Sequence, residues 1–131
     1  MKMIKRLLYW IPVLIVLAGI FYLSSKSSYS RVWFLDFPFS DKIIHLIEYS
    51  ILSWLVYRSL YYCEKIKLRN AVFITIFFTA FYGFTDEMHQ YFVPERDASF
   101  FDWVFDCLGA ILPLGFIRDV TQLKKGIKCQ E

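Results

Sequence analysis

The stretch AVFITIFFTAFYGFTDEMHQYF, residues 71–92, decides the fold of this chain. A bilayer core about 30 Å thick is crossed by around 20 helical residues, and the stretch has that length. It lacks the strict alternation of apolar and polar residues that marks a half-buried strand. We therefore expect a transmembrane helix whose last turns carry polar and ionisable side chains.

The rest of the chain has the same apolar character. Hydrophobic residues make up 57% of its 131 residues, and the mean hydropathy is +0.43, whereas a typical soluble domain is about half apolar. The excess falls in three further stretches, near residues 7–23, 43–62 and 100–117. The sequence therefore predicts an all-α polytopic membrane protein, a bundle of four transmembrane helices in a single domain over residues 1–131.

The first stretch could also be a secretory signal peptide, because a basic start precedes an apolar run and then the Ser-rich residues 24–28. The run is longer than the usual apolar region of about 7 to 15 residues, and no small-residue cleavage site follows it. We expect it to remain as a membrane anchor.

The basic residues indicate the topology. Only Lys26, Arg31, Lys42 and Arg96 flank the stretches on one side. An excess of Lys and Arg on the other side places both termini in the cytoplasm of a multi-pass protein of the cell membrane. Since these charges flank the lipid bilayer, the expected partner, no basic and aromatic face remains for a nucleic acid. The basic residues on the cytoplasmic side are Lys2, Lys5, Arg6, Lys65, Lys67, Arg69, Arg118, Lys124, Lys125 and Lys128.

Three of the four stretches carry ionisable residues at the end predicted to lie outside. Asp41, His45 and Glu48 follow an i, i+4, i+7 spacing, which places them on one helical face. Asp102 and Asp106 are four residues apart and also share a face. These faces should look toward the interior of the bundle.

Gly109 lies three residues beyond Asp106 and should allow another helix to approach on that side. An ionisable group near a helix centre costs about 2.5 to 3.5 kcal/mol on insertion scales, so these side chains must face protein or water. We expect one connected set just below the outer membrane interface, here called the polar cluster. Its members are Asp41, Lys42, His45, Asp86, Glu87, His89, Gln90, Arg96, Asp102 and Asp106.

The order and spacing of these residues resemble those of the VanZ-like membrane proteins over about residues 10–117. The resemblance implies a helical integral membrane protein of bacterial envelopes. The founding member of that family is associated with low-level resistance to the glycopeptide teicoplanin. The motifs are Asp41-Lys42-x-x-His45, Asp86-Glu87-x-His89-Gln90, Val93-Pro94-x-Arg96 and Asp102-x-x-x-Asp106-x-x-Gly109.

Two positions depart from the family pattern. Glu95 stands where members often have Gly, which bears on the turn geometry of the loop. Asp106 stands where many have Asn, which adds an acid and alters the charge of the cluster. The recurring residues carried over from the family are Asp41, Lys42, His45, Glu87, Gln90, Pro94, Arg96, Asp102, Asp106 and Gly109.

One hypothesis is a metal site. His45 and His89 would supply nitrogen ligands to a divalent ion, and nearby carboxylates would supply oxygen ligands. Those carboxylates are Glu87, Asp86 or Asp102, and the leading candidates for ligands are His45, His89 and Asp86. The spacing is not that of the His-Glu-x-x-His zinc motif. The sequence thus establishes no cofactor, although a divalent metal ion fits these residue types.

A second hypothesis is the active site of a membrane-embedded hydrolase or transferase. Glu87 or Asp102 would act as general base, and His45 as general acid or base. Arg96 would hold a phosphate group, and lipid-linked cell-wall precursors carry such groups at the outer face. No nucleophile elbow or Gly-rich phosphate loop accompanies these residues, so the sequence leaves open whether the protein is an enzyme.

A third hypothesis is purely structural. Arg96 would pair with Glu87, Asp97 or Asp102, and Asp41 with Lys42 or His45. Close-packed small residues would suffice to join four short helices, so a functional site is favoured.

The sequence predicts an envelope protein that contributes to teicoplanin-type resistance through an outer-face polar site. The alternative is a membrane-embedded enzyme acting on a lipid-phosphate or a lipid-linked cell-wall precursor. The candidate binding residues are Asp41, Lys42, Gln90, Arg96 and Asp106.

Overall fold

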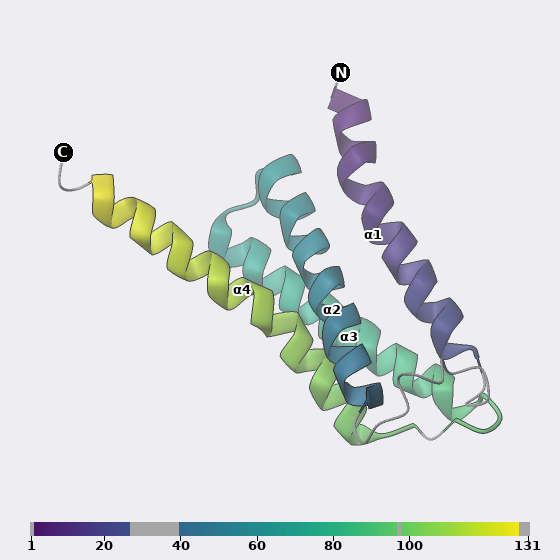
Figure 1. Ribbon diagram of the computed structural model, residues 1–131. Helices are drawn as coiled ribbons and strands as arrows, with labels where there is room; N and C mark the ends of the chain where they lie inside the picture. The colour runs from purple at the N-terminus through teal and green to yellow at the C-terminus, as the bar shows by residue number, and fades with distance from the viewer. Residues whose placement is uncertain (1, 27–39, 97, 129–131) are drawn as a thin grey trace.

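The computed structural model describes residues 2–26, 40–96 and 98–128, and within these ranges it contains helices and no strand. This confirms the all-α fold class. Figure 1 shows the helices as an elongated bundle. The elements are α1 (Lys2–Ser24), α2 (Ser40–Arg58), the short π-helical segment η3 (Ser59–Cys63), α3 (Leu68–Tyr91) and α4 (Phe100–Lys128).

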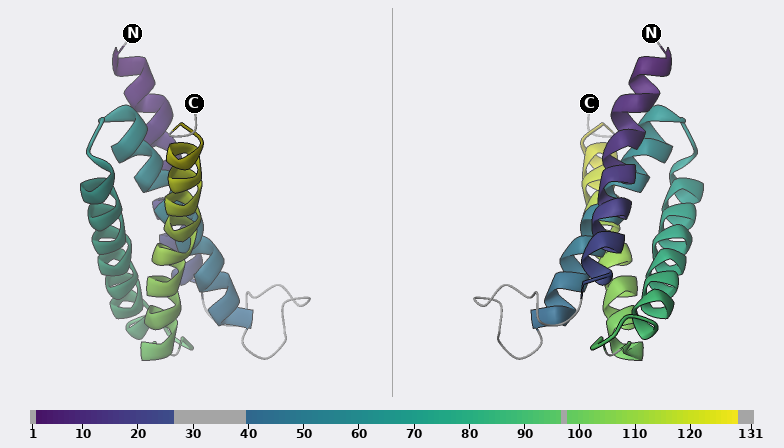
Figure 2. Two further views of the ribbon diagram at one scale, coloured as in Figure 1. Left: turned by 90° about the vertical axis from the view of Figure 1, so that its left-hand side faces the viewer. Right: turned by 90° about the vertical axis from the view of Figure 1, so that its right-hand side faces the viewer.

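Helix α2 lies at the centre of the bundle and packs against α1, α3 and α4. Helix α1 begins, and α4 ends, toward the end of the molecule opposite to the connection between α3 and α4 (Figure 2). The start of α2 and the end of α3 lie near that connection (Figure 1). The helix ends that carry the polar cluster are therefore neighbours in space.

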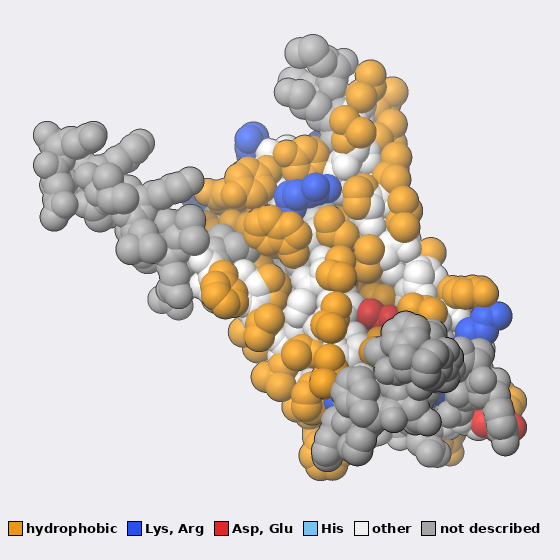
Figure 3. Space-filling view, viewed as in Figure 1, with side chains coloured by type: hydrophobic (Ala, Val, Ile, Leu, Met, Phe, Trp, Pro, Cys, Tyr) orange, Lys and Arg blue, Asp and Glu red, His pale blue; other side chains and the backbone are white. Residues whose placement is uncertain are grey.

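Two helices in the described part of the chain are long and apolar enough to cross a membrane. They are residues 6–24 of α1, with a window hydropathy of 2.2, and α3, with a value of 1.3. Hydrophobic side chains cover much of the molecular surface, as Figure 3 shows for one face. On α3, Phe73, Phe77 and Phe81 are exposed on one side.

The interior of the bundle contains buried polar side chains, although the surface is largely apolar. Thr75 and Thr79 of α3 are fully buried, on the side away from the exposed phenylalanines. Apolar packing is provided by Leu52 and Val56 of α2 together with Leu114 of α4. The inside of the bundle thus combines an apolar core with buried polar residues, as expected when lipid replaces water outside.

Glycines set the closest helix approach. A Cβ atom at Gly109 would lie 2.7 Å from the carbonyl oxygen of Leu46 and 3.1 Å from the nitrogen of Ser50. This confirms that Gly109 permits α4 to approach another helix, and it identifies that helix as α2. Gly83 of α3 has the same role toward Asp106, whose Oδ2 would lie 2.8 Å from an added Cβ.

At the opposite end of the bundle, one charged contact joins α1 to the segment after η3. Arg6 forms an ion pair of 2.8 Å with Glu64, and the indole of Trp10 donates a hydrogen bond of 3.2 Å to the same carboxylate. The bond from Trp10, together with the guanidinium of Arg6, lowers the pKa of Glu64. Because Arg6 is 66% exposed, this contact is a surface pair of modest strength.

We predict that Gly109→Ala reduces the free energy of unfolding by about 1–3 kcal/mol, because the added methyl group meets the backbone of α2. Thermal unfolding of the purified protein in detergent, followed by circular dichroism, measures the change. Gly115→Ala is the control, since nothing lies within 4 Å of its position. Equal stability of the two variants would show that the close approach of α4 to α2 has no energetic role.

Candidate functional site

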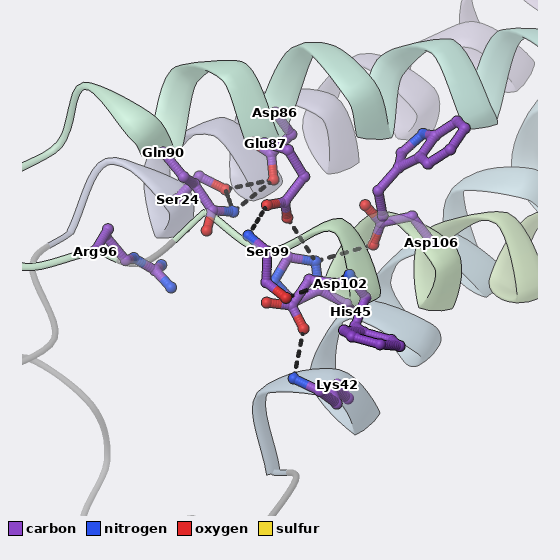
Figure 4. A network of polar contacts seen from close by, with 12 residues as sticks. Ser24, Lys42, His45, Asp86, Glu87, Gln90, Arg96, Ser99, Asp102 and Asp106 are labelled. Atoms are coloured by element: carbon purple, nitrogen blue, oxygen red, sulfur yellow. Dashed lines mark hydrogen bonds and ion pairs between the residues drawn. The ribbon is translucent and has the colours of Figure 1, made fainter.

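The polar cluster lies where four helix ends meet (Figure 4). Lys42 and His45 come from the first turns of α2, and Glu87 comes from the last turns of α3. Asp102 and Asp106 come from the first turns of α4. Lys42 and His45 are three positions apart and Asp102 and Asp106 are four, so α2 and α4 each present their two residues on one face. Glu87 of α3 meets His45 where these faces come together.

His45 makes the central contacts. Its Nδ1 atom lies 2.9 Å from Oδ1 of Asp106 and 4.0 Å from Oε1 of Glu87. The three side chains are buried, with exposed fractions of 8% for His45, 10% for Glu87 and 0% for Asp106. We call these three residues the His45 centre. Each of them is contributed by a different helix.

The backbone at the start of α4 holds Glu87 in place. Oε2 of Glu87 accepts a hydrogen bond of 2.9 Å from the backbone nitrogen of Ser99. The hydroxyl of Ser99 accepts a bond from the backbone nitrogen of Phe101 and so caps the helix. Ser99 therefore fixes both the start of α4 and the orientation of the Glu87 carboxylate.

Lys42 and Asp102 form a second pair beside the His45 centre. The ammonium group of Lys42 lies 2.9 Å from Oδ1 of Asp102, and the Asp102 side chain is buried. This pair links α2 to α4. The structural hypothesis paired Asp41 with Lys42 or His45, and the hydrogen bond that the structure shows for Lys42 goes to Asp102 on the neighbouring helix.

A third group joins α1 to α3. The hydroxyl of Ser24 donates a hydrogen bond of 2.7 Å to Oδ2 of Asp86, and the amide of Gln90 donates to the same oxygen over 3.0 Å. Ser24 was not among the expected site residues. Its position directly after the last apolar residue of α1 gave no signal, since Ser25 follows it and the sequence does not distinguish the two hydroxyls.

His89 and Arg96 make contacts that the sequence did not indicate. His89 contacts the hydroxyl of Ser25 over 2.9 Å and stacks on Phe21, so the two histidines do not share a ligand set with each other. Arg96 donates hydrogen bonds to the carbonyl oxygens of Leu23 and Lys26. These hydrogen bonds give partners to backbone carbonyl groups at the end of α1 and just after it.

Three further expectations concern Asp41, Asp97 and Glu95. Asp41 is half-buried in the first turn of α2, and Asp97 lies outside the described residues. Glu95 has a φ of 64°, in the left-handed region that glycine adopts without steric cost. This conformation gives a physical reason for the glycine that the resemblance to the family leads us to expect at this position.

Carboxylates outnumber basic groups in the interior of this site. The buried carboxylates among the described residues are Asp86, Glu87, Asp102 and Asp106, whereas the basic residue buried with them in that part of the chain is His45. Lys42 reaches Asp102 from a half-buried position. Two carboxylate oxygens, Oε1 of Glu87 and Oδ2 of Asp106, have no hydrogen-bond donor among the residues that the structure describes. The site therefore has unused acceptors, which suit a hydrogen-bond donor, a proton or a cation.

An all-α bundle with two helices apolar enough to cross a lipid bilayer, an apolar surface and a buried charged cluster indicates a helical membrane protein. The sequence matches the VanZ/LLP1 family over residues 3–121. The chain belongs to this family, which confirms the resemblance drawn from its motifs. The comparison found no match among curated proteins or among solved structures.

We predict that Lys42→Met lowers the free energy of unfolding by about 1–3 kcal/mol or more, because it leaves the buried carboxylate of Asp102 without a charged partner. The double variant Lys42→Met/Asp102→Leu should regain most of the loss, since apolar residues often replace a buried pair without cost. Chemical unfolding in detergent measures both variants.

The control for these two variants is Arg6→Met. It breaks the exposed pair with Glu64 and should lower the free energy of unfolding much less, because water screens a surface ion pair. If Lys42→Met were as mild as Arg6→Met, the contact between Lys42 and Asp102 would be no stronger than a surface ion pair.

Proposed function

We propose that this protein crosses the bacterial cell membrane four times, with both termini in the cytoplasm and the polar cluster at the outer face. The positions of the helix ends support this topology, because α1 begins and α4 ends away from the polar cluster (Figure 2). The excess of Lys and Arg in the flanking segments at that end agrees with a cytoplasmic location.

The outer surfaces of α2 and α4 support two further spans. On α2, the side chains of Ile43, Ile47 and Ile51 are exposed along one face, whereas His45 is buried on another. On α4, Leu108 and Ile111 are exposed. Of the ionisable side chains of these two helices, His45, Asp102 and Asp106 are buried, and the exposed apolar side chains would face the lipid.

We propose further that the polar cluster binds a polar group of an envelope component and thereby lowers susceptibility to teicoplanin-type glycopeptides. The observation that carries this proposal is the buried His45 centre with its two unused carboxylate oxygens. Charged groups are expensive in this setting and mark sites of function. In this proposal, the link to glycopeptides rests on the resemblance to the family alone.

The purely structural alternative explains less. At the opposite end, the ion pair of Arg6 with Glu64 and the bond from Trp10 join the helices without a buried excess of charge. At the polar cluster, by contrast, four carboxylates are buried together with one basic residue, His45, among the residues that the structure describes. A cluster selected only to join helices would pair its charges, since an unpaired buried charge destabilises the fold.

A membrane-embedded enzyme acting on a lipid-phosphate or a lipid-linked cell-wall precursor is the second candidate. It is favoured by the contact of His45 with Asp106, which orients the imidazole as in sites that use histidine for acid and base chemistry. Glu87 lies beside the same imidazole and could receive a proton. Arg96 is engaged with carbonyl oxygens of α1, which weakens its expected role in holding a phosphate.

The topology predicts which surface positions react from outside the cell. After the native cysteines are replaced by Ser, Ala98→Cys in the connection before α4 should react with a membrane-impermeant maleimide on intact cells. Lys67→Cys, before α3, should react only after the membrane is permeabilised. Both positions are exposed, so labelling of Lys67→Cys alone on intact cells would reverse the proposed orientation.

The resistance proposal is tested by teicoplanin and vancomycin susceptibility of a sensitive Gram-positive host that expresses the protein. We expect the wild type to protect selectively against teicoplanin, and Glu87→Gln and Asp106→Asn to abolish the protection. Glu64→Gln, a change at the opposite end of the bundle and outside the polar cluster, should retain it. Immunoblots of the membrane fraction must show matched levels.

Lack of protection by the wild type at a normal membrane level would contradict the resistance proposal. The enzyme candidate would then be tested directly, by release of phosphate from lipid-linked precursors with purified protein. Loss of protection in all variants through lower membrane levels would instead favour a structural role for the charges.

A further inference from the structure

We infer that the His45 centre is a binding site for a divalent transition-metal ion, held by His45, Glu87 and Asp106. This inference goes beyond the proposed role in the envelope and does not depend on it. The site would lie between α2, α3 and α4, so that each helix supplies one ligand (Figure 4).

The distances suit a metal ion. One ligand atom from each residue can be chosen so that all three lie within 4.8 Å of one another. Nδ1 of His45 is 2.9 Å from Oδ1 of Asp106 and 4.0 Å from Oε1 of Glu87. In a tetrahedral zinc site, with bonds of about 2.0–2.2 Å, ligand atoms lie about 3.4 Å apart. The observed distances lie on either side of that value, so small side-chain movements would suffice.

The unused carboxylate oxygens provide the second line of evidence. Oε1 of Glu87 points toward the imidazole of His45 (Figure 4) but finds no hydrogen-bond donor within the described ranges. Oδ2 of Asp106 also lacks one, although its side chain is fully buried. A buried carboxylate oxygen without a partner costs free energy, and a metal ion at the centre would remove that cost for at least one of them.

The charges of the three side chains lead to the same conclusion. A protonated imidazole at His45 would face two carboxylates and leave one negative charge unbalanced inside the protein. A divalent ion bound to neutral His45 would balance both Glu87 and Asp106. One nitrogen and two carboxylate oxygens are ligands that zinc and other first-row transition metals accept, whereas magnesium and calcium prefer oxygen alone.

The surroundings of the centre would hold the ligands in position. The backbone nitrogen of Ser99 donates to Oε2 of Glu87, which leaves Oε1 for the metal, and such bonds to ligating carboxylates are typical of metal sites. Gly83 leaves room for Asp106 against α3. With three protein ligands, a metal ion would keep an open position for water or a substrate group, as catalytic zinc sites do.

The test uses the full-length protein, purified in detergent and stripped of metal with a chelator. Titration with Co²⁺, followed by visible absorption, and competition with Zn²⁺ measure affinity, and elemental analysis after desalting measures stoichiometry. We expect one metal ion per chain. His45→Gln and Asp106→Asn should weaken binding at least tenfold, because each removes one ligand that the geometry assigns.

His89→Gln is the matched control. His89 lies at the same end of the bundle but contacts Ser25 and Phe21, so its substitution should leave the affinity unchanged. Circular dichroism and gel filtration must show that every variant is folded. Absence of stoichiometric metal in the wild type would overturn the inference, and so would equal affinity of the folded wild type, His45→Gln and Asp106→Asn.

Discussion

The contact between Nδ1 of His45 and Oδ1 of Asp106 fixes how the helix ends are arranged. It joins α2 and α4 where Gly109 brings α4 against the α2 backbone. If either partner moved, a buried charge or polar group would lose its compensation, which is strongly destabilising in a protein interior. The position of α4 along α2 is therefore restricted by this pair. Glu87 of α3 contacts the same imidazole. Glu87 also accepts a hydrogen bond from the backbone nitrogen of Ser99, directly before α4. The positions of the three helices therefore depend on one another.

Much of the fold could be predicted from the sequence, because apolar length and charge placement depend on local composition. The stretches 43–62 and 71–92 correspond to α2 with η3 and to α3, with differences of a few residues at each end. Helix α4 continues beyond the predicted residue 117 to Lys128, since helical hydrogen bonding does not stop where an apolar stretch stops. The close approach at Gly109 was also predictable, because a glycine one turn from buried acids leaves space on their own face.

The pairing inside the cluster could be predicted only in part. The i, i+4 spacing indicated that Asp102 and Asp106 share a face, but which cation each would meet depends on the rotation of α4 relative to α2. That rotation is set by packing at Gly109, and it places Asp102 beside Lys42 and Asp106 beside His45. The bonds of Arg96 to the backbone could not be predicted for another reason. Its bonds go to backbone carbonyls at the end of α1, and any residue type could supply such acceptors.

The hydrogen-bond donors and acceptors of the polar cluster limit which ligands it can bind. Lys42 is engaged with Asp102, and Arg96 with carbonyl oxygens, whereas Glu87 and Asp106 each keep an oxygen without a donor among the described residues. A bare phosphate would bring more negative charge to a site where carboxylates already exceed bases, and like charges in a medium of low dielectric repel strongly. A phosphate-bearing lipid would therefore need a cation between its oxygens and the carboxylates. A metal ion in the His45 centre, with one open position, would meet that need, so an envelope lipid and a metal ion can be ligands of the same site.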